Sequence, residues 1–207
     1  MNASQQFIRK HIVLLIFLLA PPFCLSTAPN AYAGFIEIGA SGSYKKSNIS
    51  ADAYDESMSL TGSIAYYLTE SSAIEASYTD GTNKRVISPN VVNGHVTQLF
   101  YTTVGLDFIY TFGSKDTAIR PYVKGGTNYI ITKRIVDQYR IADGTLWPPT
   151  PIEDTPGLVP SVGFGVRIGV TEAINLKVGV DGWTSRPLNK QPVTVDWFGR
   201  AGLSWFF

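Results

Sequence analysis

The sequence has little cysteine, histidine or charge. Cys24 is its only cysteine, it has two histidines, and charged residues make up 16% of its 207 residues. A chain without a second cysteine forms no internal disulfide, so its stability must come from backbone hydrogen bonds and side-chain packing. One cysteine and two histidines also supply no metal-ligand cluster, and no glycine-rich segment leads into a helical pattern. We therefore expect no metal and no cofactor.

Long apolar runs are also missing after Gly34, so no helix of the remaining chain is expected to cross a bilayer. The apolar run at residues 12–20 follows Arg9 and Lys10 and precedes the small-residue pattern at residues 31–33. This arrangement is typical of a secretory signal peptide, with a retained anchor as the alternative. We expect residues 1–33 to be a cleaved signal peptide and residues 34–207 to form one domain. The mature chain then has no cysteine.

Charge of either sign is not in excess. Removal of Arg9 and Lys10 with the signal peptide leaves 15 basic and 16 acidic residues. A nearly neutral chain without a basic patch argues against a nucleic-acid partner.

Period-two alternation of apolar and polar residues dominates the mature chain and predicts strands. In the second segment, for example, Met58, Leu60 and Ile64 alternate with serine and threonine. Eight such segments occur, at residues 34–45, 57–68, 74–79, 100–112, 119–131, 162–170, 174–181 and 193–207.

The connections between these segments alternate in length. Short links lie at residues 69–72, 113–116 and 171–173, and longer ones lie at residues 46–56, 80–94, 133–156 and 185–192. Short periplasmic turns and long outer loops are typical of an up-and-down barrel in an outer membrane. The sequence therefore predicts an all-β fold, an eight-stranded antiparallel up-and-down transmembrane β-barrel, with both termini in the periplasm.

The mature chain resembles the small eight-stranded outer membrane barrels, which include the transmembrane domain of outer membrane protein A, the X-type barrels and the W-type barrels. The segment at residues 120–129, RPYVKGGTNY, is similar to the fifth strand of W-type proteins. The aromatic terminus resembles the signal read by the barrel assembly machinery, with Leu203, Trp205 and Phe207 at the matching positions. The resemblance implies a monomer that contacts outer membrane lipid and lipopolysaccharide.

Strand parity places eight charged residues on the inward face, four of each sign. Because eight strands leave an interior about filled by side chains, unpaired charges there would be costly. We expect a lumen ion-pair network that closes the barrel, and the alternative is that the pairs exchange partners and gate a narrow path for small ions or solutes. The eight residues are Glu37, Glu75, Asp107, Lys124, Arg167, Lys177, Asp181 and Arg200.

Glycine is frequent on the same inward face, notably at Gly163, Gly165 and Gly179. A tightly curved barrel needs residues without side chains where large neighbours such as Tyr67, Tyr101 and Tyr122 point inward. The alternative is a slot for an acyl chain or a small apolar ligand.

Catalysis is the least supported function. Lipid-A acyl-processing enzymes are barrels of similar size and use a histidine with a serine or acidic partner. His95 is the single histidine of the mature chain, and its surroundings, GHVT, lack the His-x-Ser arrangement of the deacylases. We expect a non-enzymatic protein with no catalytic residue.

The longest connection carries Trp147 and four prolines within residues 146–156. A stiff aromatic loop binds a partner at low entropic cost, so Trp147 is a candidate recognition residue. The alternatives are that Trp147 belongs to the interfacial aromatic belt or folds over the barrel mouth. We expect a structural or surface-interaction role through the outer loops, with a narrow channel for small or hydrophobic solutes as the alternative.

Overall fold

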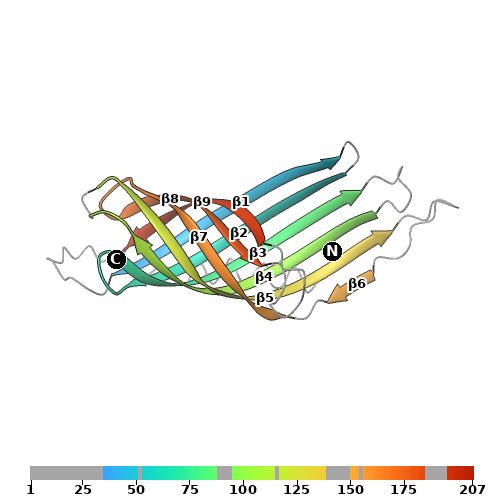
Figure 1. Cartoon of the computed structure of the whole chain (residues 1–207), viewed down its shortest axis with the longest axis horizontal. Coiled ribbons are helices and arrows are strands. Elements are labelled where there is room, and N and C mark those ends of the chain that lie inside the picture. Colours follow the sequence, from blue (N-terminus) through green and yellow to red (C-terminus); the bar gives the residue numbers. More distant parts are fainter. Residues whose placement is uncertain are drawn as a thin grey trace. The chain divides into compact units, whose positions relative to one another are not determined.

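A computed structural model describes residues 35–50, 53–87, 95–114, 117–138, 150–153, 156–184 and 195–207. These residues form one antiparallel sheet that closes on itself as a barrel (Figure 1). The expected signal peptide lies outside the described residues. The strands are β1 (Ile36–Ser50), β2 (Ala53–Tyr67), β3 (Ser72–Ile87), β4 (His95–Thr111), β5 (Ile119–Gln138), β6 (Thr150–Glu153), β7 (Gly157–Gly169), β8 (Ile174–Thr184) and β9 (Val195–Phe206).

Eight of these strands make the barrel wall. The sheet order is β4-β3-β2-β1-β9-β8-β7-β5, and the pairing of β4 with β5 closes the ring. Every pairing between neighbours is antiparallel. The predicted fold class, an eight-stranded antiparallel barrel, is confirmed.

The burial of side chains is inverted relative to a water-soluble barrel. On β2 the small polar residues Ser59 and Thr61 are buried, whereas Met58 and Leu60 are 64% and 62% exposed. The same alternation puts large apolar and aromatic side chains on the outer surface of the other wall strands. A polar interior inside an apolar outer band suits a wall that faces lipid. Among the described residues, no helix is long and apolar enough to cross a membrane.

Several strands run further than their alternation predicted. The expected connection at residues 46–56 is mostly strand, because β1 continues to Ser50 and β2 begins at Ala53. Likewise β3 reaches Ile87 and β5 reaches Gln138. The prediction of long loops was wrong here because charged residues occupy consecutive positions, such as Lys45 and Lys46, so neither face is apolar and the period-two signal disappears.

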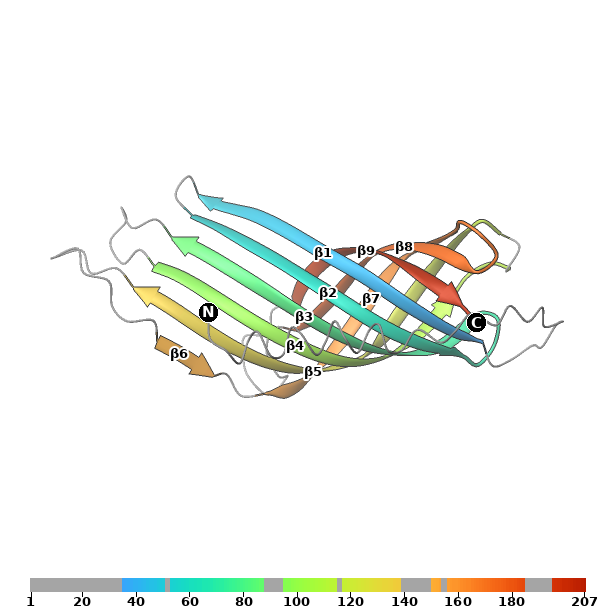
Figure 2. The ribbon, with the colours of Figure 1, turned by 180° about the vertical axis from the view of Figure 1, so that it is seen from behind.

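The barrel wall is longer on one side than on the other. The ladder between β1 and β9 ends at the pair Ser43–Arg200, and the ladder between β5 and β7 ends at Ile130–Gly157. Beyond these pairs β1–β5 continue as an extended sheet, to which β6 adds a short strand on the β5 edge. Figures 1 and 2 show β1–β5 running past the ends of β7–β9. We call this part the sheet extension.

Candidate functional site

The inward charged residues form a single connected series of ion pairs. Arg167 contacts Glu37, Glu37 contacts Lys177, and the series continues through Glu75 and Lys124 to two aspartates and Arg200. The seven N–O distances are 3.1 Å for Arg167–Glu37, 2.5 Å for Lys177–Glu37, 3.3 Å for Lys177–Glu75, 3.8 Å for Lys124–Glu75, 3.6 Å for Lys124–Asp107, 3.0 Å for Lys124–Asp181 and 2.8 Å for Arg200–Asp181. The structure thus brings together all eight residues of the expected lumen network.

Glu37 connects two basic residues at one end of the network. Its carboxylate is 1% exposed and accepts a hydrogen bond of 2.5 Å from the Tyr67 hydroxyl, in addition to its ion pairs with Arg167 and Lys177. Arg167, which is fully buried, also donates to the Tyr67 hydroxyl, and its guanidinium lies 5.5 Å and 5.7 Å from the ring centres of Tyr67 and Tyr122. This end of the interior is therefore packed with charge-assisted contacts.

Lys124 connects three acidic residues in the other half of the network. Its ammonium lies among the carboxylates of Glu75, Asp107 and Asp181. Asp107 also accepts a hydrogen bond of 2.5 Å from the Ser161 hydroxyl. A carboxylate that is removed from water is stable only next to a positive charge. The Lys124 ammonium provides that charge for all three buried acids.

Glycines make room for the network side chains. A methyl group built on Gly165 or Gly179 would lie 2.7 Å or 2.6 Å from the Tyr122 hydroxyl oxygen, and one built on Gly163 would lie 2.7 Å from a side-chain carbon of Lys124. Such distances are too short for real contacts. Gly165 and Gly179 also face backbone atoms and therefore need glycine, whereas a side chain at Gly163 would displace Lys124 and Asp181. The space above them is filled by Tyr122 and Lys124, as the geometric interpretation of the inward glycines requires.

An aromatic cluster lies beyond the ion pairs, toward the sheet extension. Tyr101, Val159, Trp183 and Phe198 are buried against one another, and the rings of Trp183 and Phe198 are stacked with centres 4.5 Å apart. Opposite Tyr101, a methyl group on Gly81 would meet the tyrosine ring. The cluster adds an apolar layer to the charged layer in the interior.

Two small cavities adjoin the network. One of about 30 Å³ is lined by Glu75, Tyr122 and Lys177, among others, and one of about 10 Å³ is lined by Thr103, Asp107 and other residues. Lys124 and Arg200 contribute to the walls of both cavities. A cavity of at least ~10–15 Å³ is needed for one water molecule, so these spaces suit single waters rather than a solute.

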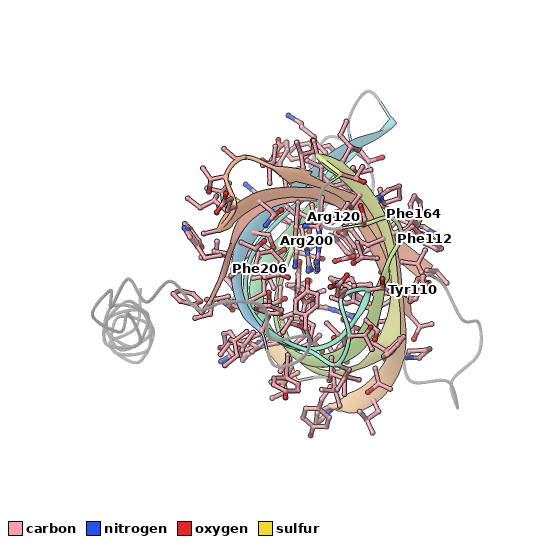
Figure 3. The ribbon with its side chains drawn as sticks, turned by 90° about the vertical axis from the view of Figure 1, so that its left-hand side faces the viewer. Tyr110, Phe112, Arg120, Phe164, Arg200 and Phe206 are labelled. Atoms are coloured by element: carbon pink, nitrogen blue, oxygen red, sulfur yellow. The ribbon has the colours of Figure 1, made fainter. Side chains whose placement is uncertain are left out.

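Two members of the interior were missed by the reasoning from sequence. Arg120 is buried and donates a hydrogen bond of 3.3 Å to the Asn175 side-chain oxygen. Figure 3 shows Arg120 and Arg200 inside the ring of strands. The sequence predicted Tyr67 as a large inward side chain, but not that its hydroxyl donates a hydrogen bond to Glu37. Parity alone could have placed Arg120 inside, since Tyr122 and Lys124 on the same strand were placed there.

Other candidate residues lie elsewhere. Trp147 lies outside the described residues, and of His95 only the backbone is described, at the start of β4. Leu203, Trp205 and Phe207 alternate along the outer face of the last strand and the residue after it, and their role as an assembly signal stays a prediction. Within the described ranges, no three His, Cys, Asp or Glu side chains are placed to hold a metal ion.

A closed antiparallel barrel with an apolar outer band and a charged, self-paired interior defines the class of outer membrane β-barrels. Residues 25–149 match the family model of the OprF membrane domain, and the chain belongs to this family. The resemblance to small eight-stranded outer membrane barrels is thereby confirmed, and family membership assigns the protein to the outer membrane.

Solved structures show the same fold. The N-terminal β-barrel domain of Pseudomonas aeruginosa OprF is 21% identical, with 86% of this chain and 100% of that chain covered and a TM-score of 0.50. Neisserial surface protein A is 17% identical, with 86% and 100% covered and a TM-score of 0.54. A comparison with curated proteins found no match. At these identities the likeness describes the fold alone.

Proposed function

We propose that this protein is a non-enzymatic outer membrane barrel with a structural and surface-interaction role, whose interior is closed. The observation that carries the proposal is the connected, charge-balanced series of eight inward side chains, six of them buried. A second layer, the aromatic cluster of Tyr101, Val159, Trp183 and Phe198, supports the same conclusion. The two cavities described beside these layers are of water size.

The sheet extension supports a surface-interaction role. It is the part of β1–β5 that lies beyond the last pair of β1 with β9 and the last pair of β5 with β7. Its exposed residues include Lys46 and Lys84. If both termini are periplasmic, as we propose, the sheet extension and the long loops lie outside the cell. Binding surfaces are commonly built from loops held by a rigid scaffold. On the outer band, exposed aromatic and apolar side chains suit contact with lipid and lipopolysaccharide.

Single-channel recording in planar bilayers tests the closed interior. We expect no discrete conductance from the wild-type protein, and none from Arg85→Ala, which changes an exposed ion pair of the sheet extension. A discrete wild-type conductance that changes in Glu75→Ala or Arg167→Ala, but not in Arg85→Ala, would overturn the closed interior. That outcome would support the narrow channel for small solutes instead.

Deletion of residues 139–149, the middle of the third long connection, tests the surface role separately. A chain without residues 139–149 keeps the paired part of β5 and β6, so the barrel is expected to form. We expect reduced adhesion to host cells or reduced lipopolysaccharide binding, measured on intact cells with equal surface amounts of both chains. Unchanged binding would remove this loop, and Trp147 with it, from the recognition surface.

A further inference from the structure

We propose that the barrel interior holds an oxyanion-binding site at Arg120, at the end where the tight turns join the strands. The ligand is a carboxylate or a phosphate group held by the Arg120 guanidinium and the Thr111 hydroxyl. This site is separate from the eight-residue ion-pair network and does not depend on the proposed surface role.

Arg120 is a buried cation that has no carboxylate partner among the described residues. It is 9% exposed, and its hydrogen bond is made to the neutral amide oxygen of Asn175, at 3.3 Å. No ion pair joins Arg120 to another described residue, although every other inward lysine or arginine discussed above has one. Removing a charge from water without pairing it is costly, so a counter-ion is expected.

Arg167, the partner of Arg120 across the sheet, makes a counter-ion for Arg120 more necessary. In the ladder between β5 and β7, Arg120 lies directly opposite Arg167, and both side chains point inward. Like charges in directly opposed positions destabilise a sheet. Arg167 is neutralised by Glu37, and the four acids and four bases of the network balance one another, so Arg120 adds one positive charge that the network does not offset. An anion at Arg120 would restore neutrality.

A second donor, the Thr111 hydroxyl, lies on β4, the strand that pairs with β5. The Thr111 hydroxyl is buried, with 2% of the residue exposed, and has no hydrogen-bond partner among the described residues. Thr111 on β4 pairs with Tyr122 on β5, and the next backbone hydrogen bond joins Phe112 N to the Pro121 carbonyl at 2.8 Å. On the inward faces of β4 and β5, Thr111 and Arg120 therefore occupy diagonal positions, since Arg120 precedes Tyr122 by two residues. A guanidinium and a hydroxyl are both donors, and together they suit the oxygens of a carboxylate or phosphate.

The test measures how inorganic phosphate changes the urea midpoint of unfolding for the full chain in a neutral detergent, at constant ionic strength. A ligand that binds only the folded state raises the ratio of folded to unfolded protein about elevenfold when its concentration is ten times the Kd. Phosphate also stabilises folded proteins without binding, so the quantity that counts is the difference between variants. We expect Arg120→Gln to lose the phosphate-dependent shift and Arg85→Gln, a change of an exposed arginine, to keep it.

Thr111→Val is the second variant, because it keeps the side-chain shape. Without phosphate it is expected to be as stable as the wild type, since it removes an unpaired hydroxyl, and with phosphate its shift is expected to shrink. N-acetylalanine in place of phosphate shows whether a peptide-type carboxylate also binds. Equal shifts in the wild type, Arg120→Gln and Thr111→Val, with either probe, would overturn the proposal.

Discussion

The sharpest prediction concerns Glu37, which neutralises a fully buried arginine. Glu37→Gln keeps the size and shape of the side chain but removes its charge. Arg167, at 0% exposure, then loses the carboxylate that lies 3.1 Å from its guanidinium. Lys177 keeps a second acid, since it also contacts Glu75 at 3.3 Å. The effect of the substitution is therefore concentrated on one uncompensated buried cation.

The size of the effect follows from burial. Breaking a buried ion pair on one side costs about 3–5 kcal/mol, whereas exposed pairs contribute about 0.2–1 kcal/mol. The chain contains a matched control, because Arg85 and Asp55 form an ion pair of the same 3.1 Å length with side chains 54% and 23% exposed. We expect Glu37→Gln to lower the free energy of unfolding by about 3–5 kcal/mol and Asp55→Asn by less than about 1 kcal/mol.

Equilibrium unfolding in urea, followed in detergent micelles or lipid vesicles, measures both values. The double variant Glu37→Gln with Arg167→Met removes both charges, and it is expected to recover most of the stability lost by Glu37→Gln alone, because apolar residues often replace buried pairs without loss. Equal small effects of Glu37→Gln and Asp55→Asn would refute the reasoning. So would a double variant whose losses simply add.

Three further substitutions test the packing and the wall. Gly165→Ala is expected to cost about 1–3 kcal/mol, because the added methyl group meets a tyrosine hydroxyl and the opposite backbone, whereas Gly199→Ala, with nothing within 4 Å, is expected to be neutral or slightly stabilising in the same urea assay. Tyr67→Phe is expected to cost about 1–3 kcal/mol by removing a hydroxyl bonded to two charged groups, and a similar loss in Tyr66→Phe, on the outer face, would contradict that explanation. Leu106→Arg on the outer band is expected to cost about 2–4 kcal/mol in vesicles but far less in detergent, and equal losses in both would argue against lipid contact.

Much of the barrel could be predicted from the sequence because the membrane imposes a strict pattern. Each strand lies between lipid and a polar interior, so apolar and polar side chains must alternate along it. The residue types of Leu60 and Thr61 therefore show which of them points outward and which points inward. Once parity was set by the apolar face, Glu37 and Arg167 had to point inward. The pattern vanished where both faces meet water, and the sheet extension was therefore predicted as loops.

The partners within the network could not be predicted in the same way. Which acid meets Lys124 depends on how far each strand is shifted along its neighbours around the ring, and alternation carries no such information. Lys124 and Asp181 are neighbours across β5, β7 and β8 only because Gly163 between them has no side chain. β6 was missed because it lies in the connection at residues 133–156, whose prolines predicted a stiff loop, although proline is tolerated in an edge strand.

The ion-pair network also restricts how this protein can change over evolutionary time. Each acid in the series touches one or two bases, and each base touches at most three acids. A reversal or loss of charge at one position can be offset only at a position it touches, so Glu37 can change with Arg167 or Lys177 but not with Arg200. Sequences of this barrel are therefore expected to vary at the eight positions in linked pairs, and the pairs that vary together would trace the contacts of the interior.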